Sequence, residues 1–128
     1  MTARDFLFVK LKRNKMQHPM RLLPAPFQAI KSGKKTIEVR LNDEKRQKFN
    51  VGDVIKLSKR PELVEKITVK IVALFHYKTF EELVKKQPIE EMCSTKMNEK
   101  EFLDGMLKHY SKEQEAKLGI LAIKIKLI

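Results

Sequence analysis

The chain has 128 residues, a length typical of one domain, and 42% of them are hydrophobic, which is enough to build a core. No apolar run approaches the roughly 20 residues needed to span a bilayer, and the N-terminal pattern is not that of a signal peptide, so we expect no membrane association. A net charge of +12 favours polyanionic partners. The lone Cys93 excludes an internal disulfide and predicts a cytoplasmic location.

The positive charge is concentrated in one half of the chain. Residues 1–60 hold 16 Lys and Arg against 5 Asp and Glu, whereas residues 61–128 hold 12 against 11. A one-sided positive field attracts nucleic acid and speeds its encounter with the protein. A lysine-rich surface that only maintains solubility would show the same numbers, so charge alone leaves both interpretations open.

The first predicted elements are short. Residues 1–17 are predicted to form a basic N-terminal arm or an added strand, and the apolar residues 20–23 predict a strand. A helix is expected to open near Pro26, because the first helical positions need no amide donor. Its buried side would hold Phe27, Ala29 and Ile30. Gly33 suits the left-handed cap that ends a helix.

From residue 35 to 41 the pattern has a period of two, which predicts a strand. One face would carry Ile37, Val39 and Leu41, and the other Thr36, Glu38, Arg40 and Asn42. Residues 42–47 are predicted to form a polar turn or short helical link. Apolar and β-branched runs at residues 54–57 and 67–74 predict two further strands.

The C-terminal half is predicted to be mainly helical until its last strand. Thr79 is expected to cap a helix whose buried stripe includes Phe80 and Leu83, and residues 99–109 show helical spacing of apolar side chains. Ser111 would begin a short third helix. Residues 119–127 alternate in strand fashion. Strands separated by helices predict an α+β domain around an antiparallel or barrel-like sheet.

Charged side chains that suit ligand binding are concentrated at residues 33–40. Glu38 and Arg40 project from one strand face, where a carboxylate can accept hydrogen bonds from a base edge and a guanidinium can bind phosphate or stack on a base. Lys35 stands just before the strand, where a local twist could bring its ammonium to the same pocket. The alternative is that Glu38 and Arg40 form an ordinary exposed ion pair.

The segment from Gly33 to Arg40, with the sequence Gly-Lys-Lys-Thr-Ile-Glu-Val-Arg, closely resembles the Gly-x-Lys-x-x-Glu-x-Arg signature of the ASCH family, the activating signal cointegrator homology domains. Residues 26–32 resemble the helix before that signature, and residues 51–53 resemble the family's Gly-Asp before a strand. The resemblance covers roughly residues 18–127 and predicts a domain over residues 18–128. It implies a PUA-like small β-barrel with inserted and flanking helices, and a cleft bordered by the signature.

The resemblance also implies a function. Relatives in the wider PUA group bind RNA, which predicts a domain that binds RNA or a modified nucleoside and acts in RNA metabolism, translation or transcription regulation. Lys35, Glu38 and Arg40 are the leading predicted ligands because they match the signature. Secondary predicted ligands are Thr36, Asn42 and Arg46, placed by proximity, and Tyr77, whose ring could stack on a base.

A catalytic alternative stays open. Some ASCH-type proteins are similar to amidohydrolases that remove an acetyl group from modified cytidine with a lysine, a threonine and a glutamate. Lys35 matches that lysine, but Glu38 occupies the position of the threonine. The alternative is therefore a small hydrolase of an acylated nucleoside or of RNA, with Lys35 and Glu38 as acid/base residues. A third hypothesis is a protein-interaction domain.

No metal or cofactor is predicted. The three histidines and Cys93 lack the spacing of metal ligands, and no glycine-rich phosphate loop is present. His18 is interpreted as a surface or capping residue, or as one that faces the cleft. The expected partners are RNA or a nucleoside, a protein partner remains open, and no membrane is expected.

Overall fold

The computed structural model describes residues 15–128, so residues 1–14 of the predicted basic arm lie outside the described part. The elements, in chain order, are β1 (Gln17–Leu22), α2 (Pro24–Lys31), β2 (Ile37–Leu41), the 3-10 helix η1 (Arg46–Lys48), β3 (Val54–Lys59), β4 (Lys66–Tyr77), α3 (Phe80–Lys86), α4 (Ile89–Met92), α5 (Glu99–His109), α6 (Lys112–Leu118) and β5 (Ile120–Leu127). The predicted α+β class is confirmed. No helix in this part of the chain is long and apolar enough to cross a membrane.

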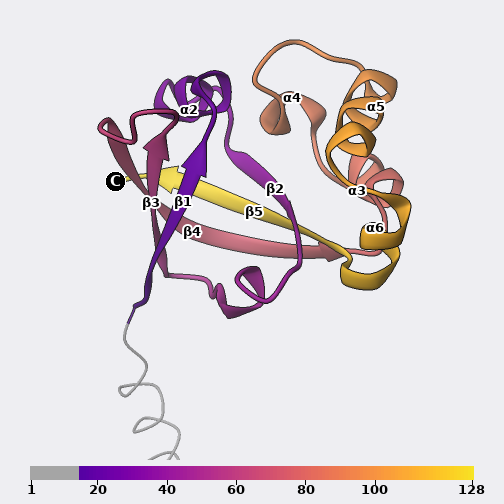
Figure 1. Cartoon of the computed structure of the whole chain (residues 1–128), viewed down its shortest axis with the longest axis horizontal. Coiled ribbons are helices and arrows are strands. Elements are labelled where there is room, and N and C mark those ends of the chain that lie inside the picture. The colour runs from indigo at the N-terminus through magenta and orange to yellow at the C-terminus, as the bar shows by residue number, and fades with distance from the viewer. Residues whose placement is uncertain (1–14) are drawn as a thin grey trace, which may run out of the picture.

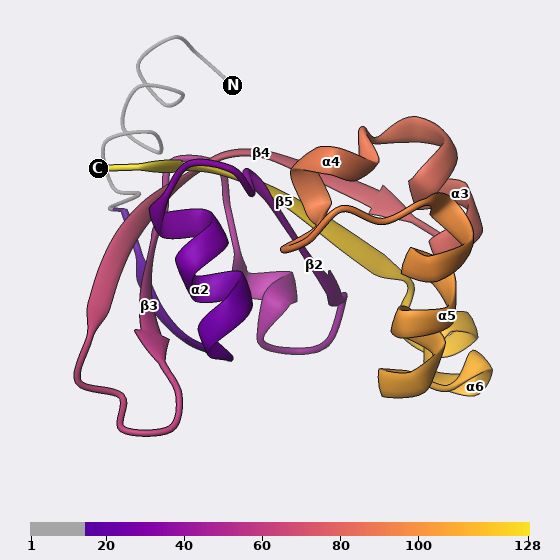
Figure 2. The same cartoon turned by 90° about the horizontal axis from the view of Figure 1, so that it is seen from above.

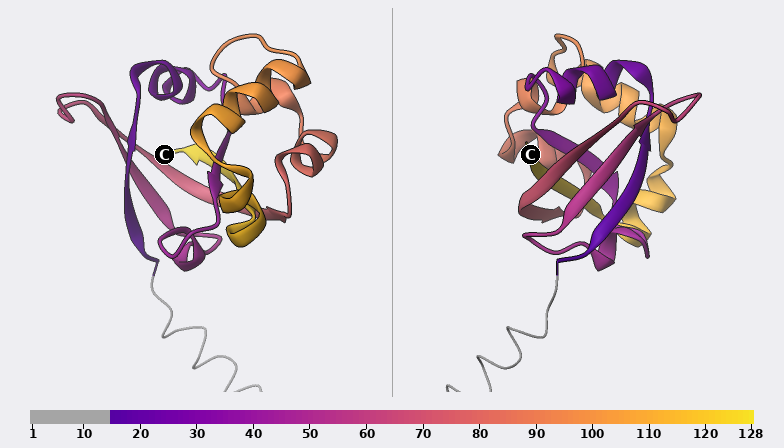
Figure 3. Two further views of the ribbon diagram at one scale, coloured as in Figure 1. Left: turned by 45° about the vertical axis from the view of Figure 1, so that its right-hand side comes forward. Right: turned by 90° about the vertical axis from the view of Figure 1, so that its left-hand side faces the viewer.

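One five-stranded sheet organises the domain, in the order β1-β3-β4-β5-β2. β1 pairs with β3 in parallel, and the other three pairings are antiparallel. The sheet curls into a half-barrel, with β1 and β2 as its two edge strands (Figures 1 and 3). The first two strands of the sequence therefore lie at opposite edges of one curved surface.

Helix α2 packs on the face of the sheet that carries the first core cluster (Figure 2). It begins at Pro24, two residues before the expected Pro26, and it buries Phe27, Ala29 and Ile30 as the sequence predicts. Gly33 follows the helix with a φ of 82°, which agrees with its predicted role as a turn glycine. The cluster also contains side chains of β1, β3, β4 and β5: Met20, Leu22, Ile55, Leu57, Val69, Ile71, Leu121, Ile123 and Ile125.

The second core cluster joins the other face of β2 and β5 to the C-terminal helices, which gather at one end of the domain (Figure 2). Thr79 caps α3 by accepting a hydrogen bond from the backbone N–H of Glu82. α5 has the predicted bounds and is opened by a capping box at Asn98. Because β5 has core on both faces, its apolar residues outnumber its lysines.

Several elements differ from the sequence predictions; β3 and β4, for example, extend beyond the predicted residues 54–57 and 67–74. β1 begins at Gln17, earlier than expected, because its parallel pairing with β3 extends to that residue. β2 begins only at Ile37, since the N–H groups of Lys35 and Thr36 donate to Ala29 and Glu91 instead of to the sheet. The four-residue helix α4 was not predicted, because one helical turn is too short to show apolar periodicity.

Candidate nucleic-acid interface

The register between β2 and β5 fixes which way the signature side chains point. Glu38 lies opposite Ile123, and Arg40 opposite Leu121. Directly opposed residues of an antiparallel pair share a face, and these two partners belong to the first core cluster. Glu38 and Arg40 therefore project toward the side of the sheet that α2 covers, from a strand at the sheet's edge.

Glu38 is the centre of a buried ion-pair network. Its side chain accepts from Lys35 Nζ at Oε1, 2.8 Å away, and from Arg40 Nε at Oε2, 3.0 Å away. Glu38 is only 5% exposed and Lys35 only 8%. The ion pair of Glu38 and Arg40 that the sequence suggests does form, but it is buried and has a third member.

The network keeps Glu38 ionised. Burial alone would raise the pKa of Glu38, but the charges of Lys35 and Arg40 and the hydrogen bonds they donate hold this pKa below its ordinary value. The two oxygens of the carboxylate are each committed to one cation. Glu38 therefore orients Lys35 and Arg40 as a fixed anion.

Arg40 extends from this network into a groove between the two edge strands. Its Nη2 donates to the backbone carbonyl of Arg21 on β1, at 3.3 Å. The groove has a volume of about 480 Å³ and is lined by Pro19, Met20, Arg21, Arg40, Lys45, Arg46 and Arg60. Among these described lining residues five are cationic and none is acidic, so we call this cavity the arginine groove.

Arg46 contributes a donor without a partner. It lies at the start of η1, where its backbone N–H donates to Asp43 Oδ1 at 3.0 Å and its Nη1 lies 3.6 Å from Asp43 Oδ2. Its Nε is buried and has no hydrogen-bond partner among the described residues. Burial, followed by the nearby charge of Arg40, lowers the pKa of Arg46. An anion in the groove would relieve both effects.

Thr36 lies apart from Glu38, although strand alternation predicts that they share a row. Because β2 has not yet begun at Thr36, its hydroxyl donates to Glu91 Oε1 in α4, at 2.6 Å. Lys124 Nζ lies 3.3 Å from the same oxygen. The hydrogen bond from the Thr36 hydroxyl is the main reason why the pKa of Glu91 is lowered. Thr36 and Lys35 line a separate, smaller cavity of about 180 Å³.

The other two predicted ligands lie outside the arginine groove. The backbone N–H of Asn42 donates to Gly119, and its Oδ1 is buried without a partner among the described residues. Tyr77 packs against the second core cluster, and its hydroxyl accepts from Gln87 Nε2 at 2.7 Å. Of the residues singled out from sequence, Arg40 and Arg46 line the groove, with Lys35 and Glu38 behind them.

Sequence reasoning missed three cations of the groove: Arg21, Lys45 and Arg60. They have no motif of their own and lie in three different segments. The one available signal was the excess of positive charge in residues 1–60, which contain every cation of the groove. Within residues 15–128 there is no cluster of three or more His, Cys, Asp or Glu side chains that could hold a metal ion.

The curled five-stranded sheet, its flanking helices and the basic groove beside a buried glutamate define an α+β half-barrel domain with a candidate anion site. The sequence matches the ASCH domain over residues 20–128, and the chain belongs to that family. The resemblance seen in the signature is thereby confirmed.

Solved structures share this fold. The hypothetical protein PH0355 is 34% identical, with a TM-score of 0.80 over 88% of this chain and 100% of that one. The protein PF0455 from Pyrococcus furiosus is 33% identical, with a TM-score of 0.71 over 88% and 98% of the two chains. ASCH from Zymomonas mobilis is 16% identical and shares the fold, with a TM-score of 0.65 over 88% and 68%. The comparison with curated proteins gave no match.

Proposed function

We propose that this protein binds RNA through the arginine groove. The observation that carries the proposal is the lining of the groove, in which five cationic side chains and no acidic one meet in a single cavity of about 480 Å³. Guanidinium groups bind phosphate oxygens in bidentate fashion, and they also stack on bases. Membership of the ASCH family supports the proposal, because its PUA-like fold is generally associated with RNA binding.

The proposal gives different roles to four residues: Lys35, Glu38, Arg40 and Arg46. Arg40 and Arg46 contact the ligand, since both line the groove. Glu38 positions Arg40. Lys35 adds a second positive charge beside Glu38, so Arg40 does not have to balance the carboxylate alone. The signature thus supplies one partly exposed guanidinium on a buried support.

The hydrolase alternative receives less support. A general base works best with a pKa near the operating pH, whereas the pKa of Glu38 is held low by Lys35 and Arg40. Each carboxylate oxygen of Glu38 already accepts from one cation, which makes Glu38 a weaker base. Binding is therefore our conclusion.

The proposal is tested with Arg40→Ala and Arg46→Ala. At low salt, each change should weaken binding of a fluorescently labelled single-stranded RNA by about tenfold, because a charge-assisted hydrogen bond is lost. Fluorescence anisotropy measures the affinity. Lys100→Ala is the control, since Lys100 is highly exposed on α5 and pairs only with Asp104 among the described residues. Unchanged affinity in both arginine variants would reject the groove as the binding surface.

We further propose that the protein works in the cytoplasm, where RNA partners of this kind are abundant. Cys93 is a free and buried thiol, and burial raises its pKa, so it is poorly reactive there. A regulatory role in translation or transcription, with a protein partner, is compatible with the same groove.

A further inference from the structure

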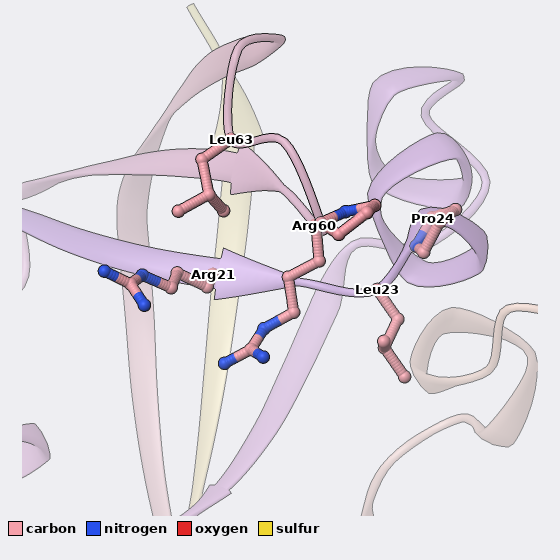
Figure 4. Close-up of a pocket in the computed structure, with 6 residues that line it drawn as sticks. Arg21, Leu23, Pro24, Arg60 and Leu63 are labelled. Carbon is pink, nitrogen blue, oxygen red and sulfur yellow. The ribbon is translucent and has the colours of Figure 1, made fainter.

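Two further depressions adjoin the arginine groove, one at each end. The first has a volume of about 280 Å³ and is lined by Arg21, Leu23, Pro24, Arg60, Pro61 and Leu63 (Figure 4). The second has a volume of about 230 Å³ and is lined by His18, Pro19, Lys45, Arg46, Lys48 and Phe49. The first shares Arg21 and Arg60 with the arginine groove, and the second shares Pro19, Lys45 and Arg46.

The three depressions follow β1 in sequence order. His18 and Pro19 line one end, residues 19–21 line the centre, and Arg21 and Leu23 line the other end. At about 3.3 Å per residue, the path from His18 to Leu23 measures roughly 17 Å. A stacked strand advances about 3.4 Å per nucleotide, so this path has room for at most about five nucleotides.

The two end depressions differ from the centre in their chemistry, because each combines apolar surface with cations. Leu23 is 59% exposed even though it is apolar. In Figure 4 the side chain of Arg60, from the turn after β3, lies between Leu23 and Arg21, and the Arg21 side chain points away from Leu23 along β1. The end of β1 therefore combines an exposed apolar side chain and two arginines in the lining of one depression.

At the opposite end the rings are largely buried, since Phe49 is 7% exposed and the His18 side chain 12%, and the exposed apolar residue is Pro19. His18 packs on Phe49 with ring centroids 4.4 Å apart, and its Nε2 is held by Asp53 Oδ2 at 2.9 Å. Arg46 places its guanidinium carbon 5.9 Å from the centroid of Phe49. His18 lines this second depression and is absent from the lining of the arginine groove.

We propose that this continuous path along β1, the β1 groove, binds an extended single strand of RNA. The central arginines contact its phosphates, and unpaired bases lie on the apolar surfaces at the two ends. The inference rests on the proposed function and deepens it. A duplex hides its bases inside the stack and could not use the end surfaces, whereas a single nucleoside could not reach both ends.

The first test is a length series. Binding to the wild-type protein is measured by isothermal titration calorimetry for uridine oligonucleotides of one, two, four and eight nucleotides. An RNA hairpin duplex with the same charge as the eight-nucleotide strand is measured in the same way. Affinity should rise by at least about tenfold from the mononucleotide to the tetramer, because stacking of each unpaired base adds to it. It should then level off, because the β1 groove is filled. The duplex should bind more weakly than the octamer.

The second test removes the apolar surface at one end. Leu23→Ser should lower the affinity for the tetramer by about fivefold or more, the loss expected for one base contact. Leu23 is the N-cap of α2 and makes no side-chain capping bond, so serine is well suited to the position and should not unfold the helix. Leu107→Ser is the matched control, since Leu107 is an exposed leucine on α5, outside the β1 groove.

A tetramer with abasic sites sharpens the second test. It keeps the phosphates but has no bases, so its affinity should be the same for the wild type and for Leu23→Ser. If the mononucleotide binds as tightly as the tetramer, or the duplex as tightly as the octamer, the strand path is wrong while the arginine groove stands. If no oligonucleotide binds the wild type at low salt, the proposed function itself fails.

Discussion

At the scale of single residues, Glu38 has the largest influence on the site. It is a buried anion that accepts from Lys35 and Arg40 at 2.8 and 3.0 Å. Removing one member of a buried ion network leaves the others as uncompensated charges in a poor solvent. Substitution of Glu38 should therefore change both the stability of the domain and the orientation of Arg40.

Glu38→Gln should lower the free energy of unfolding by about 3 kcal/mol at neutral pH, because Lys35 loses its buried counter-charge. Urea titration followed by circular dichroism measures this difference. Asp104→Asn, which removes the partner of the exposed Lys100, is the control and should change little.

The pH dependence of that difference has a definite sign. The folded-state pKa of Glu38 lies below its ordinary value of 4.5, so its stabilising effect is complete above that value and is lost as the pH falls through the folded-state pKa. The stability gap between wild type and Glu38→Gln should be constant from pH 7 to 5 and should shrink in more acid solution. A gap that widens in acid would contradict the network.

At the scale of elements, two glycines set the turns that place the edge strand β2 and its partner β5. Gly33 follows α2 with a φ of 82°, and Gly119 precedes β5 with a φ of 72°. Residues other than glycine rarely adopt this backbone conformation. A β-carbon at Gly33 would meet open space, whereas one at Gly119 would lie 3.1 Å from the carbonyl oxygen of Tyr77.

Alanine at these positions should separate backbone strain from crowding. Gly33→Ala should cost about 1 kcal/mol of unfolding free energy from strain alone, and Gly119→Ala should cost more because the Tyr77 carbonyl must also move. Gly105→Ala is the matched control: Gly105 lies within α5 with open space around it, so alanine should stabilise the helix by up to about 1 kcal/mol. Thermal melts of the three variants check the order, and equal losses at Gly33 and Gly119 would contradict the close contact.

At the scale of the whole molecule, the charge asymmetry of the sequence becomes a spatial one. The cations of residues 1–60 that line the arginine groove come from β1, β2, the link to η1, η1 itself and the turn after β3. In the C-terminal helices, Lys100 pairs with Asp104 and Lys112 with Glu115. The strongest uncompensated field among the described residues is therefore expected at the groove.

Salt should weaken RNA binding in proportion to the number of phosphates contacted. Each contact with a single strand contributes a slope of about −0.7 to the logarithm of affinity against the logarithm of salt concentration. Arg46→Ala should make the slope less steep by about this amount. Lys100→Ala should leave it unchanged. Titrations between low and physiological salt measure the slope, and equal slopes for wild type and Arg46→Ala would show that Arg46 contacts no phosphate.

The order of helices and strands was predictable from the sequence because caps, turn glycines and side-chain periodicity act locally. Thr79, Gly33 and the alternation of residues 37–41 illustrate this, and each has its predicted role. The short α4 and the late start of β2 were not predictable. Both depend on hydrogen bonds between distant segments, such as the one from the Thr36 N–H to the Glu91 carbonyl.

The sequence by itself determined the ASCH family, the α+β class and the placement of Glu38 and Arg40 on one strand face, since these follow from residue identity and a period of two. Only the tertiary structure decided what Arg40 faces. The parallel register of β1 with β3 sets Arg21 opposite Ser58, and the Arg60 N–H then donates to the Leu22 carbonyl at 2.8 Å. Curling of the sheet brings these arginines to Arg40 from the opposite edge, and no local pattern encodes that meeting.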